Sequence, residues 1–147
     1  MELDFSNEPL VYDFLQEAFV AVLLLHTALD NYANESMPAA FEMPDDTGQL
    51  IGRKQIETIW GLPKRLGKVL PAVSGKQSIK TTDPEIWAAL ETLKDLRDSI
   101  GHIHLDETFT KPGDDPAEGL FSRLIAADLL SLSAAVEMAM EYYGRLG

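Results

Sequence analysis

The stretch that decides the fold is Leu93 to His104, which reads Leu-Lys-Asp-Leu-Arg-Asp-Ser-Ile-Gly-His-Ile-His. Apolar residues recur at steps of three and four through this stretch and the residues before it, at Ile86, Ala89, Leu93, Leu96, Ile100 and Ile103. This spacing places them on one face of a helix. Beside that face lie polar residues that could carry chemistry, namely Arg97, Asp98, Ser99, His102 and His104. The stretch therefore predicts a packed helix with a candidate site on its flank.

Signals on both sides of this stretch predict further helices. Asp83 can cap the central helix and Pro84 suits its first turn, so we expect it to run from there to about Asp106. A long helix should precede it and end before Pro38. After a loop over 109–116, a last helix should span about 117–143, with its apolar stripe through Leu120, Leu124, Ala127, Ser131, Ala134, Met138 and Tyr142. Between the first two we expect a loop over 37–50, a short helix over about 51–59, a second short helix after Pro63 and a loop over 71–80.

These elements predict an all-α protein. The 147 residues fit a single domain, 1–147, and 46% of them are hydrophobic, which is ordinary for a globular chain. We expect an up-and-down four-helix bundle of mostly antiparallel helices, in which the second helix is short and broken. Because helices of this length often keep an apolar strip after the core is filled, we also expect a homodimer.

Composition excludes several classes of protein. The net charge of −12 argues against broad binding to a nucleic-acid backbone, although a local basic pocket is compatible with it. The chain has no cysteine, an acidic N-terminus and no apolar run long enough to span a bilayer, so we expect a cytoplasmic protein without a membrane segment. Basic residues concentrate between positions 53 and 80, where they either form an RNA-facing patch or balance the acidic surface.

Helix geometry divides the polar residues of the central stretch into two stripes. Arg97, Gly101 and His104 fall on one stripe, and Asp98, His102 and Asp106 fall on the next. Carboxylates one turn from His102 on both sides should raise its pKa, and Gly101 should leave a gap for a ligand. An arginine together with a histidine is a minimal set of side chains for cleaving RNA without a metal. The competing interpretation is a solvent-exposed helix face with ion pairs between residues one turn apart.

The rest of the chain offers no competing chemistry. His26 lies inside an apolar run with Asp30 one turn on, and we interpret it as a core or boundary histidine. No histidine has the Glu-x-x-His spacing of a di-iron bundle, and no Gly-rich phosphate loop or zinc spacing is present. We therefore expect no metal and no cofactor. Trp60 and Trp87 are interpreted as core or interface anchors.

The segment from Leu93 to His102, of the type Leu-x-x-Leu-Arg-Asp-x-Ile-x-His, resembles the signature of the HEPN superfamily. The distinctive part is Arg97, four residues, and then His102. The first helix with Leu29-Asp30-Asn31-Tyr32-Ala33-Asn34, the short helix around Ile56 and the break at Pro63 follow the same order as in such domains. The resemblance covers roughly residues 10–143.

The resemblance implies a helical bundle that dimerises with the motif near the two-fold axis. For active members it implies a metal-independent endoribonuclease, often the toxin of a toxin–antitoxin or phage-defence system that is partnered by an antitoxin or a nucleotidyltransferase. Carried over by position, Arg97 and His102 would be the catalytic pair, with Asp98 beside them and Ser99 and His104 as auxiliary residues. His104 stands where one subgroup has a modified tyrosine. The alternatives are a non-catalytic dimeric module that binds a protein or a nucleotide, and an unrelated helical bundle.

Overall fold

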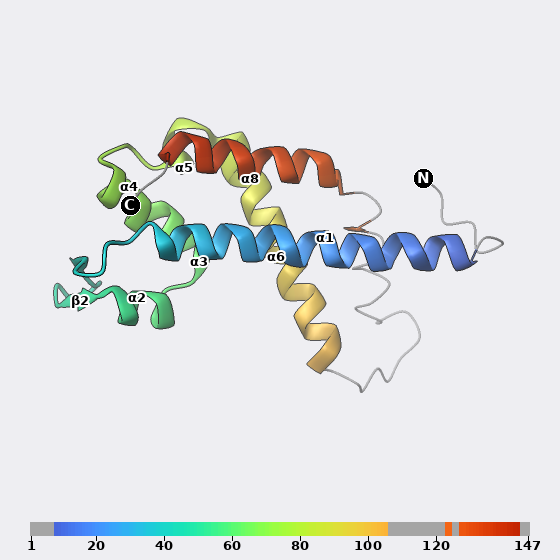
Figure 1. The fold of residues 1–147 in the computed structure, drawn as a ribbon, viewed down its shortest axis with the longest axis horizontal. Coiled ribbons are helices and arrows are strands. Elements are labelled where there is room, and N and C mark those ends of the chain that lie inside the picture. Colours follow the sequence, from blue (N-terminus) through green and yellow to red (C-terminus); the bar gives the residue numbers. More distant parts are fainter. Residues whose placement is uncertain (1–7, 106–122, 125–126, 145–147) are drawn as a thin grey trace.

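The computed structural model describes residues 8–105, 123–124 and 127–144, with side chains given over these ranges except at 8–12 and 102–105. The fold is mostly helical, as predicted (Figure 1). Its three long helices are α1 (Glu8–Glu35), α6 (Pro84–Leu105) and α8 (Leu129–Tyr143). Between α1 and α6 lie β1 (Glu42–Pro44), β2 (Leu50–Gly52), α2 (Arg53–Ile59), α3 (Leu62–Lys64), the π-helical turn η2 (Arg65–Val69), α4 (Leu70–Ser74) and α5 (Ile79–Thr82). No described helix is long and apolar enough to cross a membrane.

The central helix forms where its sequence predicts. α6 begins at Pro84, and the Asp83 carboxylate accepts a hydrogen bond from the backbone N–H of Ile86 at 3.2 Å, as an N-cap does. Leu93, Leu96 and Ile100 are all buried in the main core. Burying a leucine or isoleucine side chain is worth about 1.5–3 kcal/mol, so this seam anchors α6 in the fold.

The loop predicted over 37–50 contains a β-hairpin that the sequence analysis missed. β1 and β2 pair antiparallel, with Met43 opposite Ile51. The Asp45 carboxylate accepts hydrogen bonds from the backbone N–H groups of Thr47 and Gln49, and Gly48 adopts a positive φ of 86°. With three residues in each strand, alternation is too short to register as a pattern. The loop predicted over 71–80 is likewise partly helical, since α4 extends to Ser74 and α5 begins at Ile79.

The helix predicted over 117–143 is interrupted in its described part. The chain leaves the helical conformation at Ala127 and Asp128, and the Asp128 carboxylate caps α8 by accepting from the backbone N–H of Ser131 at 3.1 Å. Because this break resets the helical phase, the predicted stripe through Ser131, Ala134 and Met138 is exposed. The buried face of α8 instead consists of Leu132, Ala135, Val136, Ala139 and Tyr143. The loop predicted over 109–116 lies outside the described residues.

The long helices pack around one main core but do not all alternate in direction. α1 and α8 run the same way, while α6 crosses α1 steeply (Figure 1). The parallel direction is also visible in the contacts, because the Tyr32 hydroxyl near the end of α1 donates to the backbone carbonyls of Met140 and Gly144 at the end of α8. A predicted up-and-down arrangement would run the first and last helices in opposite directions, so this pair departs from it. A second, smaller core joins the hairpin to α2 and η2 through Met37, Ile51, Ile56, Trp60 and Val69.

Candidate active site at the crossing of α1 and α6

Arg97 lies on the flank of α6 next to the buried seam. Its side chain is 50% exposed, and its Nη1 donates to Asp98 Oδ1 at 3.1 Å. The guanidinium therefore stays at the protein surface beside the crossing with α1. A half-exposed arginine held by one carboxylate keeps a planar set of donors that can meet a phosphate.

Asp98 is engaged by two cations of its own helix. Lys94 Nζ lies 2.6 Å from Asp98 Oδ2, while Arg97 occupies Oδ1. Partial burial by itself would raise the pKa of Asp98, but the hydrogen bonds and charges of Lys94 and Arg97 outweigh it and hold the pKa below its usual value. Asp98 is thus ionised at neutral pH, and the ion pairs of the competing interpretation are present at this position.

Ser99 points toward a different partner. Its Oγ accepts a hydrogen bond from Nη2 of Arg123 at 2.6 Å. Arg123 comes from the segment before α8, and it brings a second arginine to α6 close to the predicted motif. The sequence contained no signal for this contact, because Arg123 is an isolated basic residue that only tertiary packing places beside Ser99.

Gly101 supplies the gap that the sequence predicts. It is exposed, and a Cβ added there would meet no atom within 4 Å. The bare backbone of α6 therefore lies open one turn beyond Arg97, on the same stripe of the helix. A ligand that contacts Arg97 can approach the helix more closely here than at any side chain with a Cβ.

The two histidines of the motif are described only as backbone. His102 and His104 belong to α6, so the helix does carry Arg97 and His102 with four residues between them. Their side chains lie outside the described part of the structure. The pairing of Arg97 with His102, and the effect of Asp98 on the pKa of His102, therefore stay predictions.

The structure brings a third histidine toward this site. His26 of α1 is half-buried, which agrees with its interpretation as a boundary residue. Burial is the largest influence and lowers its pKa below the usual value. The positive charge of Arg97 adds to this effect, while Asp30 and Asp98 oppose it. Sequence reasoning did not connect His26 with Arg97, because only the crossing of the two helices brings them into electrostatic range.

Arg65, a buried arginine of η2, binds residues of α1 that lie one and two turns beyond His26. Arg65 of η2 is only 5% exposed, and its guanidinium bonds Asp30 Oδ1 at 2.5 Å, Asn34 Oδ1 at 2.6 Å and the Trp60 carbonyl at 3.0 Å. Asp30 and Asn34 follow His26 at steps of four, so all three lie on one stripe of α1. Arg65 thereby attaches η2 and the hairpin region to α1, and its charge is compensated within the protein.

The basic residues between 53 and 68 mostly find acidic partners in the same chain. Arg53 pairs with Glu57, and Lys64 and Lys68 both pair with Asp46. These ion pairs agree with the interpretation that the basic residues balance the acidic surface. Trp60 and Trp87 are both buried, as expected for core anchors.

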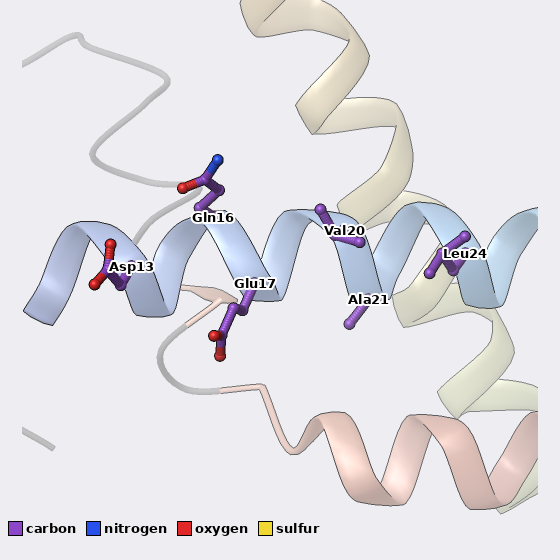
Figure 2. A pocket seen from close by; sticks show the side chains of 6 residues that line it. All are labelled: Asp13, Gln16, Glu17, Val20, Ala21 and Leu24. Atoms are coloured by element: carbon purple, nitrogen blue, oxygen red, sulfur yellow. The ribbon is translucent and has the colours of Figure 1, made fainter.

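A hollow of about 470 Å³ runs along another face of α1 (Figure 2). Its described lining is Asp13, Gln16, Glu17, Val20, Ala21 and Leu24, all from α1, with carboxylates at one end and apolar side chains at the other. At about 100° per residue, Leu24 points roughly 160° away from His26. The hollow is therefore separate from the crossing with α6, and its carboxylates would repel a phosphate.

Taken together, this part of α6 holds an exposed arginine, an ionised aspartate and an open stretch of helix backbone, and α1 carries a half-buried histidine within the electrostatic influence of the arginine. Such a set can bind an anion and accept a proton. Comparisons with known protein families, with curated proteins and with solved structures find no match for this chain.

Proposed function

We propose that this protein is a HEPN-type, metal-independent endoribonuclease that acts as a homodimer. Arg97 would bind the scissile phosphate and stabilise its developing negative charge, and His102 would transfer a proton. Asp98 would orient His102 or tune its pKa. The proposal includes a HEPN-like four-helix bundle as the fold. Its three long helices would be α1, α6 and α8, and the segment from Leu62 to Ser74 would be its short helix.

The observation that carries this proposal is the combination of Arg97 and Gly101 on one stripe of α6. Arg97 is half-exposed, and the backbone beside it is open at Gly101. An anion that binds the guanidinium can therefore lie against the helix one turn before its end, where the sequence carries His102. Both Lys94 and Arg97 contact Asp98, but Lys94 is the closer at 2.6 Å against 3.1 Å, so Arg97 is the less tightly held of the two cations on this part of α6.

The dimer in this proposal has support from the exposed face of α1. Val20 is 51% exposed and Leu24 is 64% exposed, and both line the hollow on α1 that Figure 2 shows. Apolar side chains gathered on one helix face commonly mark an interaction surface. A toxin role, with an antitoxin or a nucleotidyltransferase as partner, would be one biological use of the same activity.

A second candidate function is a non-catalytic dimeric binding module. The ion pairs of Asp98 with Lys94 and Arg97 favour it, because they resemble a solvated helix face in which the charges are already satisfied. The net charge of −12 also favours a protein partner over RNA.

The two functions differ in what Arg97→Ala and His102→Ala do to RNA cleavage. We expect purified wild-type protein to cleave oligoribonucleotides in the presence of EDTA. Arg97→Ala should lower the rate by about 10²–10³-fold, because it removes a donor to the developing charge. His102→Ala should lower it by about 10²–10⁴-fold.

Lys68→Ala is the control, since it removes an exposed basic charge outside α6 whose partner, Asp46, also binds Lys64. Thermal unfolding of each variant separates a catalytic loss from a loss of fold. A wild-type protein without RNA-cleaving activity, or cleavage that survives both Arg97→Ala and His102→Ala, would contradict the enzyme and leave the binding module.

A further inference from the structure

The hollow on α1 combines two kinds of side chain. Val20 and Leu24 line its apolar end, and the carboxylates of Asp13 and Glu17 line the other end (Figure 2). From Asp13 to Leu24 the hollow follows the helix for about 16 Å, or about three turns. At about 100° per residue, this face lies roughly opposite Val22, which is fully buried in the main core. The hollow is therefore on a face of α1 that its packing into the main core leaves over.

The apolar end of the hollow is open to solvent. Val20 is 51% exposed and Leu24 is 64% exposed, and Leu23 beside them is 42% exposed. Counted from Val20, these residues have the i, i+3, i+4 spacing by which one helix packs against another. Burying them would remove apolar surface from water, so this end of the hollow favours a partner with an apolar helix face.

The acidic end of the hollow restricts the charge of that partner. Asp13 and Glu17 lie one turn apart, and neither has an ion pair with a cation in the described part of the chain. α1 cannot supply a cation itself, because Glu8–Glu35 contains no lysine or arginine. Asp30, further along the same helix, is by contrast paired with Arg65. An occupant that neutralises Asp13 and Glu17 therefore has to bring its own basic side chains.

Other parts of this chain do not offer such an occupant. Residues 1–7 carry two carboxylates and no lysine or arginine, and residues 106–122 carry five carboxylates and one lysine. A second copy in a two-fold contact would meet the hollow with the same set of side chains, which includes no cation. Only a partner that combines an apolar face with basic residues complements both ends of the hollow.

We propose that the hollow is the docking site for an amphipathic helix of another protein. This helix places apolar side chains on Val20 and Leu24, and a lysine or arginine beside Asp13 and Glu17. The inference goes beyond the proposed function and does not require RNA cleavage. Because the same apolar side chains support the dimer, a second copy and this helix would compete for the face. The charge of the hollow makes the basic helix the better occupant.

The test uses two labelled, designed helical peptides that share a leucine face. One carries lysines at one end, and its twin carries glutamates at the same positions. Fluorescence anisotropy measures their binding to the wild-type protein. We expect the lysine peptide to bind at least about tenfold more tightly than its twin, and its Kd to rise as the salt concentration is raised. No binding of the lysine peptide, or equal binding of the two peptides, would overturn the proposal.

One pair of variants locates the apolar contact. Leu24→Gln should raise the Kd of the lysine peptide about tenfold, because it removes an anchor from the apolar end of the hollow. Leu50→Gln is the matched control, since Leu50 lies on β2 and is 62% exposed, close to the value for Leu24. Leu50→Gln should leave the Kd unchanged. Equal effects of the two substitutions would show that the peptide does not dock on α1.

A second pair of variants locates the charge contact. Asp13→Asn combined with Glu17→Gln should raise the Kd about fivefold and flatten its salt dependence. The control combines Glu137→Gln with Glu141→Gln, which removes two exposed carboxylates at the same spacing from α8. A similar loss of binding in this control would overturn the proposal, because non-specific attraction to an acidic protein predicts that result. Thermal unfolding shows that each variant is folded.

Light scattering with and without the lysine peptide separates the two occupants of the face. A dimer that keeps its mass at saturating peptide and loses it in Leu24→Gln would assign the hollow to a second copy and overturn the proposal. Dissociation of the dimer by the lysine peptide would support it. RNA cleavage is measured separately, so a protein that binds the peptide without cleaving RNA would contradict the nuclease and leave the docking site in place.

Discussion

Two regions of this molecule use basic side chains in opposite ways. In the segment from Arg53 to Val69, the arginine and lysine side chains for which the structure shows ion pairs bind carboxylates of the same chain, and Arg65 is buried as it does so. At the crossing of α1 and α6, Arg97 keeps half of its side chain exposed beside an open glycine. The difference suggests that arginine is structural in the first region and available to a ligand in the second.

The largest effect that we expect is a loss of stability when Arg65 is replaced. Arg65→Met should lower the free energy of unfolding by about 2 kcal/mol, because it removes a buried guanidinium and leaves Asp30, whose side chain is 35% exposed, Asn34 and the Trp60 carbonyl without their donor. Urea denaturation followed by circular dichroism measures this change. Arg97→Ala serves as the matched arginine variant and should cost less than about 1 kcal/mol. Equal losses in the two variants would remove the distinction between the regions.

A substitution at Gly101 tests whether a ligand uses the open helix backbone beside Arg97. Gly101→Ala should raise the free energy of unfolding by roughly 0.5–1 kcal/mol, since alanine is the better helix former and its methyl group meets no neighbour. The same methyl group fills the space beside Arg97, so RNA cleavage should fall while stability rises. Thermal unfolding and cleavage are measured on the same preparation. A variant that is more stable and equally active would show that no ligand uses this gap.

The smallest expected effect concerns acid stability at Asp98. Its pKa is lowered in the folded state by Lys94 and Arg97, so its contribution is fully present above the unfolded pKa near 4 and is lost as the pH falls through the lower folded value. Because the side chain is 36% exposed and screened by solvent, we expect about 0.5 kcal/mol. Asp98→Asn should lower stability at pH 7 by that amount and leave it unchanged near pH 2. An equal effect at both pH values would mean that packing, rather than charge, is responsible.

Local signals predicted most of the helical elements. The seam at Leu93, Leu96 and Ile100 and the cap at Asp83 lie where their spacing and chemistry indicate. The hairpin was missed because three-residue strands do not build a period. The face of α8 was misassigned because one capping residue, Asp128, interrupts the phase that the sequence pattern assumed to be continuous.

The features of the candidate site also fall into those that the sequence predicted and those that only the structure revealed. Arg97 and the gap at Gly101 could be placed from helix geometry alone, since residues three and four apart in a helix are neighbours. The contacts of Arg123 with Ser99 and the influence of Arg97 on His26 could not be placed in this way. Each joins residues from separate elements, and the spacing of residues along the chain carries no information about them.

The sequence by itself determined where the long helices α1 and α6 form and which of their residues carry a charge or a proton, because helix periodicity and capping act within a few residues. Only the tertiary structure decided which charged side chains are paired within the protein. It placed Arg65 against Asp30, 35 residues away, and brought His26 into the field of Arg97. The physical reason is that burial and Coulomb interaction depend on distance in space, which the crossing of helices sets.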